Sequence, residues 1–450
     1  MRTTTLRPLA AVLTALTLLT AFASRLPAAE SDDLKLLRDQ IRVLEKKLLV
    51  LERKQEIQDE KVAITDKGYT LASADAANAL RVRGLVQFDS RLFFGDGNTA
   101  VNNAFLLRRA RPIFEGTFNK IYSFQLVPEF GGSSVSILDA NLNVAFAKSF
   151  QLKAGKFKSP LGLEQLQSDS WAFFAERSLV TNLVPNRDLG LQAGGELFNG
   201  TVSYAAGIFN GVADGASTTN TDFDNEKDAV ARVFASPFKN TLGSPLQGLS
   251  FGVAASLGRE KTAAALTGGY RTDGQQTFFR YRTTTIADGQ TWRVSPQASY
   301  YYGSFGALAE YVVSTVNVRP SATGARTELQ HRAWQLAAGY VLTGEAASYA
   351  GVVPKADFNF KDGTWGAFEV VARYASLDID DKAFPLLADP AASGTKANSI
   401  GLGLNWYLSK SLRATVDYFQ TSFAAGSTTP SNAVLRQNEE ALITRLQLTF

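Results

Sequence analysis

The sequence predicts an all-β protein, a 16-stranded antiparallel transmembrane β-barrel preceded by a short N-terminal coiled-coil helix. After Leu80, successive segments alternate apolar and polar side chains, which is the period of a strand with one face toward lipid. About sixteen such segments follow one another, and their connections are alternately short and long, as in bacterial outer-membrane barrels. The last ten residues, 441–450, alternate in the same way and end on Phe450, an ending typical of those barrels.

Residues 1–23 are typical of a secretory signal peptide, with a basic start (Arg2, Arg7), an apolar centre and a small-residue cleavage site at Ala23. A second cleavage point is Ala29. The apolar stretch is too short to span a bilayer, which argues against a membrane anchor. We therefore predict that the protein is exported.

Residues 31–62 are predicted to form a coiled-coil helix in the periplasm, because spacings of three and four alternate as in a heptad seam. The seam consists of Leu34, Leu37, Ile41, Leu44, Leu48, Leu51, Gln55, Gln58 and Val62. An isolated helix of this length is marginal, so we expect partner helices, and a trimer fits. The alternative is a single amphipathic helix against the following domain. The polar, Ala-rich residues 63–79 are predicted to be a linker.

Composition excludes several kinds of site. The chain has no Cys, so disulfides and thiolate metal sites are impossible, and one His leaves zinc binding and histidine catalysis almost without ligands. We expect no metal and no cofactor. The formal net charge of +4 is too small to indicate a nucleic-acid partner, and we expect none. The lone His331 lies on the inward face of a predicted strand and is expected to be solvent-facing and not catalytic.

Residues 80–450 are predicted to form the barrel, seated among lipid and lipopolysaccharide in the outer membrane of a Gram-negative bacterium. Counted from Leu80, the even-numbered connections are short, and the odd-numbered ones are long and rich in Gly, Asp, Ser and Thr. This pattern places the long loops outside the cell. Two even-numbered connections, 237–248 and 343–364, are long, so we expect either extra structure there or an error in the strand count. Sixteen strands leave room for a water channel.

The connection from Lys158 to Leu189 falls after the fifth strand, at the position of the third external loop. It carries Trp171, Phe173 and Phe174, aromatic side chains that should not stand in water. We predict that this loop folds into the barrel and narrows the channel. The alternative is a surface loop that packs its own aromatic side chains or meets a neighbouring subunit.

Several short segments after Leu80 carry a family resemblance through their order and spacing. They are Leu107-Arg-Arg-Ala-Arg111, Phe114-Glu-Gly116, Ala154-Gly-Lys-Phe-Lys-Ser-Pro-Leu-Gly-Leu-Glu164, Phe174-Ala-Glu-Arg-Ser178, Pro185-Asn-Arg-Asp-Leu-Gly190, Tyr340-Val-Leu-Thr-Gly-Glu345, Gly366-Ala-Phe-Glu369 and Arg373-Tyr374. In these segments the chain resembles the phosphate-selective porin O and P family of outer-membrane proteins. The resemblance implies a homotrimer of sixteen-stranded barrels with basic residues along an anion path. It also implies roles for an arginine pair, Arg108 and Arg109, and for a constriction lysine, Lys153 or Lys156.

Strand alternation places many charged side chains on the inward face. The basic ones are Arg81, Arg83, Arg91, Arg109, Arg111, Lys153, Arg373, Arg413 and Arg445, and the acidic ones are Asp89, Glu115, Glu129, Asp139, Glu369 and Asp417. Basic groups along a narrow passage replace the hydration that an anion loses. Arg109 and Arg111 share a face and could grip one anion, whereas Arg108 should face lipid unless a bulge or the membrane edge intervenes. Alternatively, these arginines pair with the carboxylates and brace the wall.

The predicted anion-binding, pore-lining residues are Arg81, Arg83, Arg108, Arg109, Arg111, Lys153, Lys156 and Arg373. The predicted function is passive diffusion of small anions, with phosphate or polyphosphate as candidates, through a trimeric barrel that is not an enzyme. The connection from Lys158 to Leu189 carries three basic and four acidic side chains, so we expect a weak anion preference and not strict phosphate specificity. The alternatives are a non-selective general porin, a barrel that tethers the envelope and, less favoured, an outer-membrane hydrolase.

Overall fold

The computed structural model describes most of the chain. The described residues are 32–59, 61–65, 68–94, 102–132, 134–218, 222, 224–262, 266, 268–425 and 438–450. The predicted signal peptide, 1–23, and the second cleavage point, Ala29, lie outside them. The chain divides into two compact units, residues 1–60 and residues 61–450.

The first unit contains the helix α2 (Asp32–Asp59), within the stretch predicted to be a coiled coil. The seam side chains Leu37, Leu44 and Leu51 are more than half exposed in the single chain. An apolar seam on a lone helix gains stability only when another surface buries it. The helix is therefore established, whereas its pairing into a coiled coil stays a prediction. No helix among the described residues is long and apolar enough to cross a membrane.

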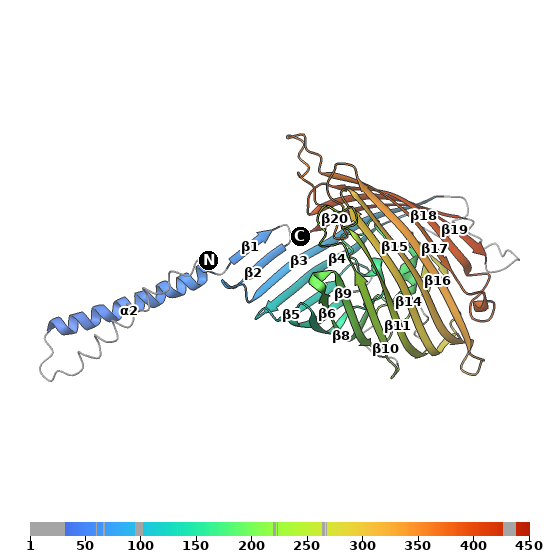
Figure 1. Ribbon diagram of the computed structural model, residues 1–450, viewed down its shortest axis with the longest axis horizontal. Coiled ribbons are helices and arrows are strands. Elements are labelled where there is room, and N and C mark those ends of the chain that lie inside the picture. The colour runs from blue at the N-terminus through green and yellow to red at the C-terminus, as the bar shows by residue number, and fades with distance from the viewer. Residues whose placement is uncertain are drawn as a thin grey trace. The chain divides into compact units, whose positions relative to one another are not determined.

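Sixteen antiparallel strands of the second unit form one closed sheet, which confirms the predicted barrel (Figure 1). The last strand closes it by pairing with the first barrel strand, from Glu440 opposite Phe94 to Thr449 opposite Leu85. Closure pairs the strand edges within the sheet, as lipid requires. The sixteen strands are β3 (Ala79–Phe94), β4 (Ala104–Phe118), β5 (Tyr122–Glu129), β6 (Ser136–Ala147), β7 (Phe150–Lys158), β8 (Arg187–Leu197), β9 (Val202–Phe209), β10 (Asp228–Ala235), β11 (Leu249–Thr262), β14 (Ile286–Tyr302), β15 (Phe305–Arg319), β16 (Thr327–Val341), β17 (Ala367–Asp378), β18 (Gly394–Tyr407), β19 (Leu412–Ala425) and β20 (Asn438–Thr449).

Two further strands, β1 (Lys61–Thr65) and β2 (Gly68–Ala72), occupy part of the predicted linker, 63–79, so that prediction needs correcting. β2 pairs with β1 and with the first residues of β3. The C-terminal strand stops nearby, where Phe450 and Gly84 exchange two backbone hydrogen bonds. Because the C-terminal strand ends there, the first residues of β3 would have one edge without a neighbouring strand. β2 pairs with this edge and satisfies its backbone N–H and C=O groups. A five-residue strand is too short for its alternation to stand out from a polar loop.

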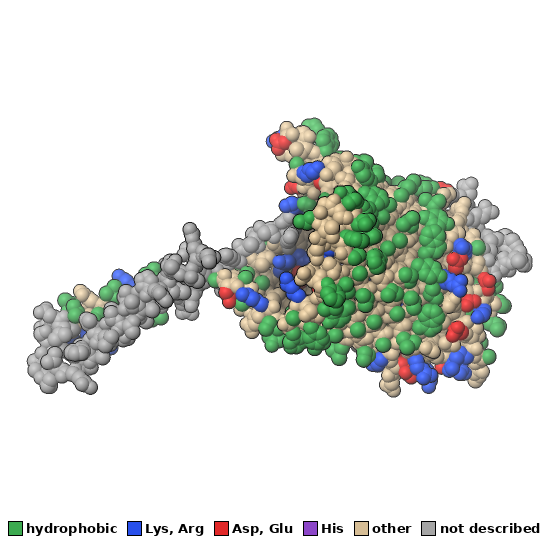
Figure 2. All heavy atoms as spheres, viewed as in Figure 1, with side chains coloured by type: hydrophobic (Ala, Val, Ile, Leu, Met, Phe, Trp, Pro, Cys, Tyr) green, Lys and Arg blue, Asp and Glu red, His purple; other side chains and the backbone are tan. Residues whose placement is uncertain are grey.

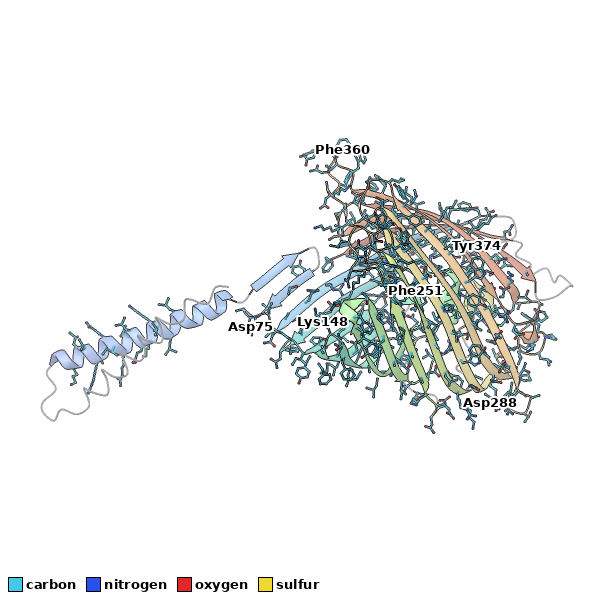
Figure 3. All side chains as sticks on the ribbon, viewed as in Figure 1. Asp75, Lys148, Phe251, Asp288, Phe360 and Tyr374 are labelled. Atoms are coloured by element: carbon cyan, nitrogen blue, oxygen red, sulfur yellow. The ribbon has the colours of Figure 1, made fainter. Side chains whose placement is uncertain are left out.

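The connections alternate between short and long, as predicted. Turns such as 148–149 and 303–304 lie at one end of the barrel, which we call the turn side, and the long loops lie at the other, the loop side. Figure 3 labels Lys148 on a turn and Asp288 at the opposite end. One long loop contains the short strands β12 (Tyr270–Arg271) and β13 (Thr277–Phe279).

Two turn-side connections are long, 236–248 and 342–366, close to the bounds expected from the sequence. The strand count is correct, so these connections carry extra structure. In the second, Asn359 and Thr364 form an isolated β-bridge. This connection also reaches into the barrel, as described below.

The outer face of the barrel is apolar. Figure 2 shows hydrophobic side chains spread over the outer face of the strands. On β20 the predicted alternation is confirmed, because Leu446 and Leu448 are 52% and 43% exposed, whereas Arg445 and Gln447 are 3% and 1% exposed. The exposed apolar face is the one that lipid acyl chains cover in an outer-membrane barrel.

Candidate functional site

The third loop-side connection, residues 159–186, packs against the inner wall of the barrel, and we call it the inward loop. It contains two short helices, α3 (Leu163–Leu166) and η1 (Leu179–Leu183). Phe173 and Phe174 are buried in one apolar cluster with wall residues, and Phe174 packs on Phe419 with ring centroids 5.5 Å apart. Burial of one such side chain contributes about 1.5–3 kcal/mol relative to exposure. The aromatic run that looked unsuited to water therefore fastens the loop to the wall.

Polar side chains of the wall bind the backbone of the inward loop. Asp417 accepts a hydrogen bond from the N–H of Ala175 at 2.7 Å, and Glu310 accepts from Leu163 at 2.7 Å and Glu164 at 3.1 Å. Three wall donors reach loop carbonyls: Arg413 to Ala172, Asn405 to Phe173 and Gln447 to Ser170. Backbone groups taken out of water need such partners. These inward-facing polar residues therefore hold the loop in place.

The long turn-side connection, 342–366, meets the inward loop from the other end of the barrel. Tyr349 donates its hydroxyl to a carbonyl of α3 at 2.6 Å, and Gln167 donates to the carbonyl of Tyr349 at 2.8 Å. Gly351 lies under the indole of Trp171, where its φ is +93° and an added Cβ would sit 2.3 Å from the ring. Only glycine fits this close approach. The inward loop is thus supported from the turn side as well as by the wall.

Two cavities lie along the other part of the wall, from β3 to β10. The loop-side cavity has a volume of about 430 Å³ and the turn-side cavity one of about 600 Å³. Arg111, Asp169 and Arg187 line both cavities. The two cavities therefore adjoin at these three charged side chains.

Basic side chains outnumber acidic ones in both cavities. The loop-side cavity is lined by the basic residues Arg108, Arg109, Arg111, Arg177, Arg187 and Arg271 and by the acidic residues Glu129, Asp169, Glu176 and Asp214. The turn-side cavity is lined by the basic residues Arg83, Arg111, Lys153, Lys158, Arg187 and Arg232 and by the acidic residues Asp139 and Asp169. The positive excess is larger on the turn side, which favours anions there.

A β-bulge turns Arg108 into the barrel. The register between β3 and β4 shifts by one residue between Gln87 and Phe88, and Arg108 is the extra residue. Its Nε lies 2.6 Å from Oε1 of Glu176 in the inward loop. Strict alternation would have pointed this arginine at lipid, and the bulge is the exception that prevents it.

One carboxylate of the inward loop neutralises several arginines at once. Asp169 contacts Arg111, lies 3.3 Å from Arg109 and lies 2.5 Å from Arg177. Burial alone would raise the pKa of Asp169, but the guanidinium groups of Arg109, Arg177 and Arg111 hold that pKa well below its usual range. Arg109 and Arg111 do grip one anionic group together, and here that group is the protein's own Asp169.

Glu176 acts in the same way on a second set of arginines. Besides Arg108, it pairs with Arg91 at 2.6 Å and with Arg445 at 3.3 Å. These pairs join the wall to the inward loop. The predicted alternative, pairing with carboxylates of the wall itself, occurs between Arg83 and Glu115 and between Arg111 and Glu129. A cation paired at such a distance exerts only a weak net field on a passing ion.

Three basic side chains of the turn-side cavity have no carboxylate within salt-bridge distance in the described part of the chain: Lys153, Lys158 and Arg232. The Lys158 ammonium donates to the carbonyl of Gln167 at 2.8 Å, and Arg232 donates to the side chain of Gln297 at 3.0 Å. Neutral partners leave the positive charges uncancelled. These three side chains are therefore the basic groups that could interact with an anion in this cavity.

Five of the eight predicted site residues line the two cavities, namely Arg83, Arg108, Arg109, Arg111 and Lys153. The other three line neither of them. Arg81 is exposed on the part of β3 that pairs with β2. Lys156 lies three residues beyond Lys153 on an alternating strand, and its ammonium donates to the carbonyl of Thr218 at 2.8 Å. Arg373 faces inward but is covered by the inward loop, where it pairs with Glu164 at 3.2 Å.

Sequence reasoning missed Arg232 and counted Arg187 only as a loop residue. Arg232 shares the inward face of β10 with Val230 and Phe234, both packed in apolar clusters. Because apolar residues occur on both faces of this short strand, its sequence shows no clear alternation, and Arg232 could not be assigned to the inward face. Arg187 lies at the first position of β8, where the loop ends.

The single histidine is buried, which corrects the expectation of a solvent-facing side chain. The Nε2 of His331 lies 2.5 Å from the hydroxyl oxygen of Tyr281, and its Nδ1 accepts from the N–H of Asp380 at 3.1 Å. Alternation placed His331 inward correctly, but loop-side residues cover that part of the lumen. Both ring nitrogens therefore have a hydrogen-bond partner. Among the described residues no group of three or more Asp, Glu or His side chains could hold a metal ion.

The sequence of the barrel matches a known family. The model of the phosphate-selective porin O and P family matches residues 80–450. The chain belongs to this family. It is therefore an outer-membrane porin of a Gram-negative bacterium, in agreement with the prediction from its sequence.

Individual relatives of this porin agree. Porin O of Pseudomonas aeruginosa is 24% identical over 415 residues, which make up 86% of this chain and 92% of Porin O. Among solved structures, the outer membrane channel DcaP of Acinetobacter baumannii has a TM-score of 0.53 at 12% identity, covering 84% of this chain and 98% of DcaP. OmpT of Vibrio cholerae in its trimer form has a TM-score of 0.51 at 12% identity, covering 83% of this chain and 100% of OmpT. At such identities the structural likeness establishes the fold alone.

Proposed function

We propose that the porin lets small anions diffuse passively through the two cavities beside the inward loop. The observation that carries this proposal is the turn-side cavity, where Lys153, Lys158 and Arg232 have no carboxylate partner in the described part of the chain. A unit charge 4 Å from an anion contributes about 1 kcal/mol even in water, and more where the dielectric constant is lower. Three such charges raise the local concentration of anions over cations.

Passage then follows from the order of the charged side chains. An anion enters on the loop side near Arg271 and reaches the junction, where Arg111 and Arg187 replace part of its hydration shell. It next meets the unpaired cations of the turn-side cavity and leaves toward the short turns. Several moderate attractions in series let the ion enter and also let it leave.

Inorganic phosphate and polyphosphate are among the anions proposed to pass, without strict specificity. Asp169 and Glu176 already occupy most arginines of the loop-side cavity, so these do not form a free arginine ladder. A neutralised loop side also favours the second candidate, a general porin with little charge preference. The two differ in the reversal potential that they predict.

Trimeric assembly is part of the proposal. The exposed leucines of α2 support a periplasmic coiled coil. OmpT, which has a similar fold, was solved in a trimer form. The signal peptide at 1–23 is proposed from sequence alone. We infer that the chain is a channel without catalytic activity, because its family consists of porins and its lone histidine is committed to fixed partners. Membership of a porin family also disfavours the hydrolase and the envelope tether.

A planar-bilayer measurement tests the function. The purified porin is inserted into a neutral lipid bilayer, and the reversal potential is measured across a tenfold gradient of KCl. We expect a potential of the sign given by chloride permeating faster than potassium. A potential near zero would support the general porin, and the absence of any current would contradict both.

A further inference from the structure

The turn-side cavity has an apolar surface that a path for inorganic ions does not require. Leu85, Ile113 and Val127 follow one another on the inward faces of β3, β4 and β5, and all three line the cavity. The inward faces of porin strands are ordinarily polar, because they meet water. Ile113 remains partly exposed, with Leu85 and Val127 buried beside it.

The inward loop adds an aromatic side chain to this surface. Trp171 and Leu166 line the same cavity, and both are partly exposed. Gly351 supports the indole from behind, and Gln167 donates to the Trp171 carbonyl at 3.2 Å. Arg413 holds the neighbouring carbonyls of the loop. The indole is therefore fixed in place before any ligand arrives.

The loop-side cavity differs in this respect. Besides glycines, its apolar lining among the described residues is limited to Leu138 and Ala216. It is also the cavity in which acidic residues neutralise most arginines. Apolar surface and available positive charge thus occur together in one cavity and not in the other.

We propose that the turn-side cavity binds anions that carry an aromatic body, a deepening that rests on the proposed anion-porin function. Lys153, Lys158 and Arg232 attract the charged group, and Trp171, Ile113 and Leu166 contact the flat apolar part. The volume of about 600 Å³ is that of a pocket for a small organic molecule. An inorganic ion has no apolar surface and gains nothing from the indole, whereas a ring gains stacking and burial. An organic anion should therefore stay in this cavity longer than an inorganic one. While it occupies the cavity, the chloride current through the porin should be lower.

The test compares two anions that differ only in the apolar body. Current through the purified porin in KCl is titrated with phenyl phosphate and with methyl phosphate at the same pH. We expect phenyl phosphate to halve the chloride current at a concentration about tenfold lower than methyl phosphate, because ring contacts act in addition to the shared charge. Trp171→Ala should reduce the difference to less than about threefold. Trp365→Ala, on an exposed indole of the turn-side connection, is the matched control and should keep the full difference.

Each outcome decides the proposal. Equal potency of the two phosphates in the parent porin overturns it, even when the reversal potential shows an anion preference. A full difference retained in Trp171→Ala overturns the assignment to this cavity. If that variant fails to insert, Ile113→Thr, in the part of β4 beyond the bulge, replaces it. Failure of the proposed function is separate, because it appears as a KCl reversal potential near zero in the parent.

Discussion

The two halves of the barrel wall use the same residue types in different ways. In the half from β11 to β20, which we call the covered half, Glu310, Asp417 and Arg413 bind the backbone of the inward loop. In the half from β3 to β10, the cavity half, Lys153 and Arg232 stand beside open space with no carboxylate partner in the described part of the chain. All five side chains face inward. Whether an inward charge acts on ions therefore depends on whether the loop covers it.

The pairing of arginines with carboxylates differs between the two cavities because the inward loop reaches only one level of the barrel. Asp169 and Glu176 belong to the inward loop, and they reach the arginines that lie at its level. The turn-side cavity lies beyond that level, where the loop supplies one carboxylate, Asp169, and the wall supplies another, Asp139. The inward loop thus determines where the two cavities lie and how many of their basic side chains lack a carboxylate partner.

The largest expected effect comes from neutralising the cavity half. The triple variant Lys153→Gln, Lys158→Gln and Arg232→Gln should lower the anion-to-cation permeability ratio roughly tenfold, since each unpaired cation, screened by the salt in the channel, contributes about 0.5 kcal/mol. The reversal potential in a KCl gradient measures the ratio. Arg332→Gln, at an exposed position of β16, removes one positive charge away from the cavities and should leave the ratio unchanged. A triple variant with the parent ratio would remove the basis of the proposed path.

A smaller effect, of opposite sign, should follow from freeing the arginines at the junction. Asp169→Asn removes the carboxylate shared by Arg109, Arg111 and Arg177, and we expect the anion-to-cation permeability ratio to rise about threefold. The measurement is again the reversal potential. Asp288→Asn, on the loop-side rim, is the control for loss of one negative charge. A lower ratio in Asp169→Asn would show that this carboxylate does not restrain the arginines.

Substitutions in the covered half should lower the stability of the porin and leave its ion selectivity unchanged. Arg373→Met leaves Glu164 and Asp273 buried without their partner, so the free energy of unfolding in urea should fall by about 3–5 kcal/mol. The permeability ratio should change less than twofold. Lys396→Met, which breaks an exposed pair with Asp378, is the matched control and should cost about 0–1 kcal/mol. A large change of selectivity in Arg373→Met would contradict the division between the two halves.

The smallest effect is expected at Arg81. This residue was selected by strand alternation, but it is exposed and lines neither cavity. Arg81→Ala should leave the reversal potential and the single-channel conductance at the parent values. A shift comparable to that of the triple variant would place the path nearer the start of β3 than the cavities indicate.

Much of the candidate site was predictable, and the errors have identifiable causes. Alternation correctly turned Arg83, Arg109 and Arg111 inward, because side-chain direction in a strand follows from local geometry. It could not select Arg108, whose direction depends on a bulge set by pairing with β3. It also could not show that Arg373 would be covered by a loop about 200 residues earlier in the chain.

The barrel, its sixteen strands, the two kinds of connection and the face to which each regular side chain points could be predicted from the sequence alone. These follow from a period of two residues and from the need to satisfy every backbone group in lipid. The tertiary structure alone decided which inward charges stay free, because the inward loop and the connection 342–366 meet residues far away in the chain. Contacts across such distances depend on closure of the whole cylinder, and no local pattern encodes them.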